Sequence, residues 1–138
     1  QSTGVIDDKS KCVLLADRHH GLRDSVRGLL ETTFEAVIMV ADEASLFEGV
    51  ARLMPAIVVL DLSFAAGDAN ELLARITKYS PTSKILILSV HDEPSVINAV
   101  LEAGAHAVVL KRSLATDLLP AVESLHAGLR YVSSEIGQ

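Results

Sequence analysis

The stretch that most constrains the fold is a short apolar run that ends in an acid. Residues 55–61 have the sequence Pro-Ala-Ile-Val-Val-Leu-Asp, and a β-branched run without alternation indicates a strand that is buried on both faces. Such strands belong to parallel sheets covered by helices, and ligands of these sheets bind beyond the carboxyl ends of the strands. Asp61 is therefore placed for chemistry, with a helix N-cap as the structural alternative.

Four further apolar runs have the same character, and amphipathic stretches separate them. The runs span residues 12–17, 35–41, 84–89 and 106–111. The stretches between and after them carry apolar residues at helical spacing, namely Val26, Leu29 and Leu30; Leu46, Phe47 and Val50; Leu72, Leu73, Ile76 and Tyr79; Val96, Ile97, Val100 and Leu101; and Leu118, Val122, Leu125 and Leu129. This alternation predicts an α/β fold, a doubly wound five-stranded parallel sheet with helices on both faces.

Capping residues predict where several helices begin and end. The pair Asp42-Glu43 is typical of a helix start, where acids favour the positive end of the helix dipole, although two acids also allow a metal site. Gly104 is expected to stop the helix before the fifth strand. The last helix is expected to begin near Asp117, with Pro120 in its first turn, and to end at Gly128.

Composition restricts the function classes. The chain has 138 residues, which is the size of one domain, and 49% of them are hydrophobic while only 4% are aromatic, so the core must be aliphatic. The net charge of −6 argues against nucleic-acid binding by this chain itself. No apolar run approaches the roughly 20 residues needed to span a bilayer. No membrane association is therefore expected.

The amino-terminal region and the single cysteine suggest where the protein works. Residues 1–11 are polar and lack periodicity, so we expect a flexible arm rather than a secretory signal. Cys12 is the only cysteine, which excludes an intrachain disulfide and fits a reducing cytoplasm. It precedes an apolar run, so a packed thiol is expected.

Four of the five predicted strands end in polar residues of complementary chemistry. Asp17, Asp61, Ser89 and Lys111 end the first, third, fourth and fifth strands, and such ends lie side by side in a doubly wound sheet. A carboxylate can attack phosphorus, and a cation must then offset the charge of the incoming phosphoryl group. Acidic oxygens suit Mg²⁺. The set therefore predicts a phosphoryl-accepting site.

These residues and their surroundings resemble the receiver domain of bacterial two-component response regulators, a CheY-like, flavodoxin-like fold. The resemblance covers about residues 12–128 and depends on the segments that end in Asp17, in Asp61-Leu62-Ser63, in Ser89-Val90-His91-Asp92 and in Lys111. Within the family, the chain is most similar to the NarL/LuxR type. The similarity comes from His19, the Leu-Ser-Val-His-Asp run at 88–92, Glu-Ala-Gly-Ala at 102–105 and His-Ala-Gly-Leu-Arg-Tyr-Val-Ser at 126–133.

The resemblance implies a role for each pocket residue. Asp61 would accept a phosphoryl group from a histidine kinase, and Mg²⁺ would be held by Asp17, Asp61 and the backbone carbonyl of Ser63. Ser89 and Lys111 would contact the phosphoryl group and shift the surface formed by the last two helices and the fifth strand. The chain would then be a signalling domain and not an enzyme.

The resemblance also implies a wider architecture. We expect a receiver domain over 12–129 and, over 130–138, the start of a linker to a DNA-binding output domain that this chain lacks. A homodimer is expected. It would form through the first and fifth helices or through the fourth and fifth helices, and the sequence does not choose between these two surfaces. DNA would be contacted only through the output domain.

The chain departs from the family pattern in four places. Arg18 stands where a second acid is usual, so Mg²⁺ binding is expected to be weakened or dispensable. An inward Arg18 would pair with Asp17 or Asp61, and an outward one would be a solvated loop residue. The loop after Asp61 has Phe64-Ala65 and Ala69 where Met-Pro and glycine are common, and Val108 replaces an aromatic switch residue.

Three other functions compete with phosphoryl acceptance. A degenerate receiver would serve as a phosphorylation-independent dimerisation or docking module, which Arg18, Ala65 and Val108 favour and the retained Asp61, Ser89 and Lys111 oppose. A phosphohydrolase would need a general acid at position 63, which is serine. A nucleotide-binding domain would need a G-x-G-x-x-G turn after the first strand, and none is present. All five histidines are expected to be surface or loop residues.

Overall fold

The computed structural model describes residues 12–17, 20–65 and 68–133. Six parallel strands form one sheet in the order β2-β1-β3-β4-β5-β6. The strands are β1 (Cys12–Ala16), β2 (Ala36–Val40), β3 (Ile57–Asp61), β4 (Lys84–Ser89), β5 (Ala107–Leu110) and β6 (Tyr131–Val132). The helices are α2 (His20–Leu30), α3 (Glu43–Leu53), α4 (Ala69–Tyr79), α5 (Pro94–Glu102) and α6 (Leu114–His126), with 3₁₀ turns η1 (Leu62–Ala65) and η2 (Lys111–Ser113).

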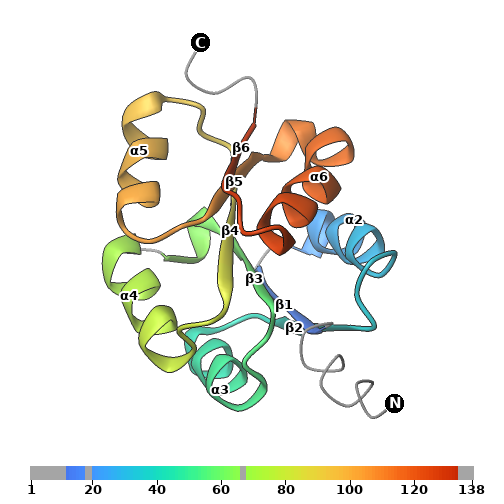
Figure 1. Ribbon diagram of the computed structural model, residues 1–138, viewed down its shortest axis with the longest axis vertical. Helices are drawn as coiled ribbons and strands as arrows, with labels where there is room; N and C mark the ends of the chain where they lie inside the picture. Colours follow the sequence, from blue (N-terminus) through green and yellow to red (C-terminus); the bar gives the residue numbers. More distant parts are fainter. Residues whose placement is uncertain (1–11, 18–19, 66–67, 134–138) are drawn as a thin grey trace.

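Helices cover both faces of the sheet, as the alternating pattern predicts. Helices α3, α4 and α5 lie on one face and α2 and α6 on the other (Figure 1). Successive strand residues point to opposite faces, so Val58 belongs to the core under α3–α5 while Val59 belongs to the core under α2 and α6. The doubly wound α/β fold is confirmed.

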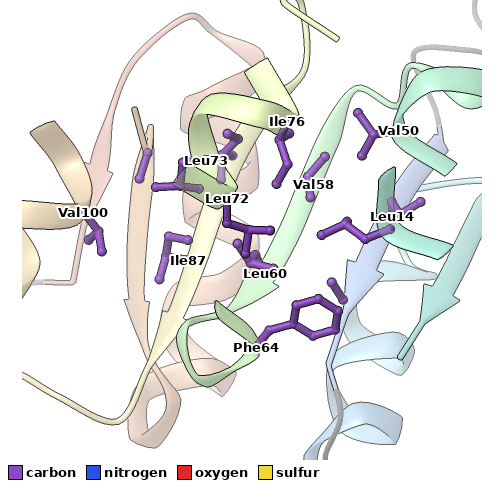
Figure 2. Close-up of a cluster of buried hydrophobic side chains, with 14 of the residues drawn as sticks. Leu14, Val50, Val58, Leu60, Phe64, Leu72, Leu73, Ile76, Ile87 and Val100 are labelled. Atoms are coloured by element: carbon purple, nitrogen blue, oxygen red, sulfur yellow. The ribbon is translucent and has the colours of Figure 1, made fainter. Parts of the chain in front are cut away.

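Both cores are mainly aliphatic. Figure 2 shows the core under α3–α5, where Val58, Leu60 and Ile87 project from the strands on the side of Leu72, Leu73 and Ile76 of α4, while Leu14 lies beneath α3. All strand residues from Ile57 to Asp61 are buried. Central strands buried on both faces hold the carboxyl edge of the sheet in a fixed position.

None of the helices in the described ranges is long and apolar enough to cross a membrane.

Local capping explains several of the helix boundaries. The carboxylate of Asp42 accepts a hydrogen bond from the backbone N–H of Ser45 at 2.8 Å, so the Asp42-Glu43 pair begins α3, as its capping interpretation predicts. Pro94 occupies the first turn of α5, and Gly104 has φ of 125° just after that helix ends. Helix α3 therefore begins, and helix α5 ends, where the sequence indicates.

The sheet has a sixth strand that the five-strand prediction omits. Gly128 has φ of 81°, and this turn brings the chain back so that Tyr131 pairs with Ala107 and Val132 with Val108. Ser133 continues the contact, because its Oγ accepts the backbone N–H of Leu110 at 3.0 Å. A strand of two residues carries too little apolar pattern to be recognised from sequence.

The prediction for the last helix is wrong at its start and in the extent of its apolar stripe, whereas the expected stop at Gly128 is confirmed, because α6 ends at His126 and Gly128 follows with a positive φ. Helix α6 begins at Leu114 and not near Asp117, because η2 runs directly into it, and Pro120 therefore lies inside the helix and not in its first turn. Leu129 is 63% exposed and follows the helix, so it is not part of the buried stripe. Tyr79 is also largely exposed, at 42%, and its ring lies against Phe47.

Candidate functional site: a polar pocket at the carboxyl edge of the sheet

The structure places the four predicted polar residues at one edge of the sheet. Asp17 follows β1, Asp61 ends β3, Ser89 ends β4 and Lys111 follows β5, and these four strands are consecutive neighbours. Asp17, Asp61 and Ser89 are buried, with exposures of 0%, 2% and 1%. Each side chain is held where an apolar strand stops, so the packing of the strands sets the geometry of the pocket.

Asp61 and Lys111 form an ion pair at the centre of this edge. Asp61 Oδ2 accepts a hydrogen bond from Lys111 Nζ, although the two residues are 50 positions apart. Asp61 Oδ1 accepts the backbone N–H of Ser63 at 2.9 Å and the Ser63 hydroxyl at 2.8 Å. Both carboxylate oxygens are thus held by donors from two different parts of the chain.

The donors around Asp61 decide its charge. Burial raises the pKa of Asp61, but the hydrogen bonds from Lys111 and Ser63 and the charge of Lys111 outweigh that effect, so its pKa is lowered from the ordinary value. The carboxylate is consequently anionic at neutral pH. An anionic, fixed carboxylate beside a cation is what nucleophilic attack on phosphorus requires.

Ser89 faces its own loop in this conformation. Its hydroxyl donates to the carbonyl oxygen of His91 and accepts the backbone N–H of the same residue, both at 2.9 Å. These two bonds close a tight turn directly after β4. To donate to a group bound at Asp61, the Ser89 hydroxyl would have to leave His91.

Asp17 is fully buried next to the pocket, and its backbone N–H donates to the carbonyl oxygen of Val40 at 3.2 Å. This bond extends the pairing of β1 with β2 by one residue. Arg18 and His19 lie outside the described residues, so the hypothesis that Arg18 enters the pocket stays a hypothesis.

The donor set fits Mg²⁺ in kind. This edge holds the buried carboxylates of Asp17 and Asp61, with Ser63 two residues after Asp61 in η1, and Mg²⁺ takes oxygen ligands while keeping several waters. Across residues 12–17, 20–65 and 68–133, no three side chains of histidine, cysteine, aspartate or glutamate gather into a metal centre. Two carboxylates suit Mg²⁺, which keeps several waters, better than they suit zinc, which prefers a cage of side chains.

Several contacts were not anticipated from sequence. The Ser63 hydroxyl joins its backbone in binding Asp61. His106 lies in the bend before β5, but its ring is half-buried and Nδ1 accepts the N–H of Ile85 at 3.0 Å. Asp92 and Arg112 form an ion pair at 3.0 Å beside the pocket. A lone histidine or a loop charge carries no sequence signal for such partners.

Burial settles the character of Cys12. Its side chain is 8% exposed, and burial raises the pKa of the thiol. Cys12 is therefore a packed thiol, as its position before an apolar run predicts.

Comparison with known proteins shows which family the chain belongs to. The sequence profile of the response regulator receiver domain matches residues 13–123. The response regulator UvrY of Escherichia coli O6:H1 is 31% identical over 130 residues, covering 91% of this chain and 59% of UvrY. The oxygen regulatory protein NreC of Staphylococcus epidermidis is 29% identical over 127 residues, covering 90% of this chain and 58% of NreC. The chain thus spans a little under three fifths of these relatives.

Solved structures agree with the sequence matches. A LuxR-family two-component response regulator from Aurantimonas sp. SI85-9A1 superposes with a TM-score of 0.83 at 28% identity, covering 94% of each chain. The isolated receiver domain of RcsB from Salmonella enterica serovar Typhimurium, solved with the phosphomimetic BeF3⁻, gives 0.79 at 25% identity, covering 92% of this chain and 96% of that one. The chain therefore belongs to the response regulator receiver domains, and within them to the LuxR type.

Proposed function

We propose that the chain is a phosphoacceptor domain that takes a phosphoryl group on Asp61 from a histidine kinase. The observation that carries this proposal is the buried Asp61 carboxylate, held by Lys111 at the carboxyl edge of the sheet. A purely structural ion pair would explain the contact between Asp61 and Lys111. It would not explain why the polar side chains of Asp17, Ser63 and Ser89 lie at the same edge of the sheet. The retained chemistry favours a working acceptor over a degenerate receiver.

Each residue of the site has a separate role in the proposed phosphoryl transfer. An oxygen of Asp61 forms a bond to phosphorus while the phosphorus–nitrogen bond of the kinase phosphohistidine breaks, and the departing imidazole keeps the electron pair. Lys111 offsets the negative charge of the incoming phosphoryl group, and the donors of Ser63 hold Oδ1 of Asp61. Ser89 then donates to a phosphoryl oxygen after leaving His91.

Asp17, Asp61 and the carbonyl of Ser63 would hold Mg²⁺ in this proposal. The ion supplies positive charge to the transferring phosphoryl group when it is bound. Arg18, which stands where the family usually has a second acid, would make the ion weakly bound or dispensable. A guanidinium there would pair with the carboxylates and supply part of the same charge.

The output would follow from movement of the surface formed by α5, β5 and α6. RcsB, one of the structural neighbours, has been solved as two dimers bound to two parallel DNAs. By analogy, we infer that phosphorylation changes the dimerisation of this chain and, through it, the action of a DNA-binding output domain. This step is a shift between two packings of the same fold.

The test is an intact-mass measurement after incubation with acetyl phosphate and Mg²⁺. One phosphoryl group, removed by hydroxylamine as expected for an acyl phosphate, should appear on the wild type and on Asp24→Ala, which alters an exposed acid of α2. Asp61→Ala should gain none. An adduct on Asp61→Ala, or none on the wild type even with histidine kinases supplied, would favour the phosphorylation-independent module instead.

The same measurement without Mg²⁺ tests the role of Arg18. Formation of the phosphoryl adduct in the absence of Mg²⁺ would support Arg18 as a replacement cation. Loss of the adduct in the wild type, together with unchanged Mg²⁺ affinity in Arg18→Asp, would place Arg18 outside the pocket.

A further inference from the structure

An exposed ion pair joins the two loops that flank the pocket. Arg112 Nη2 lies 3.0 Å from Asp92 Oδ2, and the two side chains are 51% and 48% exposed. Asp92 is in the loop after β4, three residues beyond Ser89, and Arg112 directly follows Lys111. The contact therefore connects the loop that carries Ser89 to the turn that carries the pocket cation.

The loop after β4 has a reason to need such a contact. Val90 is 65% exposed although it directly follows a buried strand, and leaving an apolar side chain in water is unfavourable. The neighbouring pair of His91 and Glu93, at 3.5 Å, lies within the loop and does not reach β5. The Asp92–Arg112 pair, in contrast, links this loop to the turn after β5.

We propose that the Asp92–Arg112 pair is a latch that holds the loop in the conformation in which Ser89 bonds to His91. Opening the latch frees the Ser89 hydroxyl for a phosphoryl group on Asp61, so the latch opposes activation. This inference rests on the proposed function. Asp92 and Arg112 act as positioning residues, because their effect on Asp61 passes through Ser89 and Lys111.

The backbone supplies the coupling between the latch and the pocket. Lys111 points inward to Asp61 while Arg112 points outward to Asp92, so a shift of Lys111 toward a phosphoryl group moves the base of Arg112 as well. Exposed ion pairs bias equilibria modestly, by about 1.5- to 5-fold. The latch is therefore expected to tune the population of the active conformation and not to block it.

The test measures binding of beryllofluoride, a phosphoryl analogue, to the wild type, Asp92→Asn, Arg112→Gln, the double variant and the charge swap Asp92→Arg with Arg112→Asp. Both single variants should bind about two- to five-fold more tightly, the double variant no more tightly than the singles, and the swap should return toward the wild type. Glu48→Gln and Arg52→Gln remove another exposed pair, on α3, and should change nothing.

The two single variants separate the latch from simple charge effects. Removing an acid near an anion site strengthens anion binding, and removing a cation weakens it, so electrostatics alone predicts opposite shifts. The latch predicts shifts in the same direction. Opposite shifts, or additive effects in the double variant, would overturn it.

Amide hydrogen exchange at His91, without any phosphoryl analogue, gives a second readout. The His91 N–H bonds to Ser89 Oγ, so opening the latch should speed its exchange about two- to five-fold in each single variant. Unchanged exchange in a protein that binds beryllofluoride would overturn the latch alone. A wild type that does not bind beryllofluoride would overturn the proposed function and the switching role of the latch together.

Discussion

Lys111 and Arg112 are neighbours in sequence, yet they form two very different ion pairs. The Lys111 side chain is 16% exposed and its partner Asp61 only 2%, whereas Arg112 and Asp92 are 51% and 48% exposed. Both cations lie in η2, directly after β5, but Lys111 turns toward the edge of the sheet and Arg112 toward the loop after β4. Two adjacent positive charges can thus belong to different electrostatic environments.

The difference in burial sets what each pair contributes. A buried charge that loses its partner retains its full desolvation penalty, while water replaces the partner of an exposed charge. Asp61 is 2% exposed, so water cannot replace Lys111 there, but Asp92 can be solvated. The buried pair is therefore expected to affect stability and chemistry, and the exposed pair mainly the population of loop conformations.

The largest expected effect comes from breaking the buried pair. Lys111→Met should lower the free energy of unfolding by about 3 kcal/mol at pH 7, because it leaves Asp61 charged and buried. Urea unfolding measures this loss. Asp61→Asn in the same chain should recover most of it, and a loss no larger than that of Arg112→Met would contradict the comparison.

Acid titration should show the Asp61 contribution directly. Its folded-state pKa is lowered from the ordinary value of 3.8, so the stabilisation is fully present above about pH 4 and is lost as the pH falls through the folded pKa. The difference in unfolding free energy between the wild type and Asp61→Asn should therefore narrow below pH 4. A constant difference from pH 7 to pH 3 would show that the carboxylate is not stabilised by its donors.

His106 is an intermediate case, since its ring is half-buried. His106→Ala should cost about 1 kcal/mol at pH 7.5, because the Ile85 N–H loses its acceptor. Burial, with Lys84 and Arg130 nearby, lowers the pKa of His106, so its contribution is present above about pH 6.5 and lost as the pH falls through the lower folded pKa. Urea unfolding across pH 5 to 7.5 should show this loss in the wild type and in the exposed control His91→Ala, but not in His106→Ala.

The smallest effect belongs to the exposed pair. Arg112→Gln should lower the free energy of unfolding by about 0.5 kcal/mol at low salt. The difference should disappear in 1 M NaCl, where screening acts within about 3 Å. The effect of Lys111→Met should survive the same salt, and equal salt dependence of the two variants would remove the distinction between the pairs.

The sequence was most informative where one run of residues carried the whole signal. The strand from Ile57 to Asp61 lies where its β-branched run predicts, and the strand ends that carry Asp61 and Lys111 meet because parallel strands share one carboxyl edge. Their roles in phosphoryl transfer stay predictions. Ser63, two residues after Asp61, is predicted to act through its carbonyl, but its hydroxyl and backbone N–H bind Asp61.

Features that depend on pairwise geometry could not be predicted in the same way. Strand β6 has only two residues. Ser133, which follows it, accepts a hydrogen bond through its side-chain hydroxyl from the backbone N–H of Leu110, 23 positions away. The pair of Asp92 and Arg112 joins two loops 20 positions apart. Neither contact produces a periodic pattern in the sequence, because each depends on the positions at which two separate turns end.

The aliphatic core has a practical consequence for spectroscopy. The chain has three phenylalanines and no tryptophan, and Phe34, Phe47 and Phe64 are all buried, at 4%, 9% and 0%. Phe34 lies beside the His126 ring and Phe47 beside Tyr79, on opposite faces of the sheet, whereas Phe64 lies in η1, three residues after Asp61 (Figure 2). Uniform labelling with fluorophenylalanine should therefore give three ¹⁹F signals, of which one reports the pocket and two serve as internal references for the helical layers.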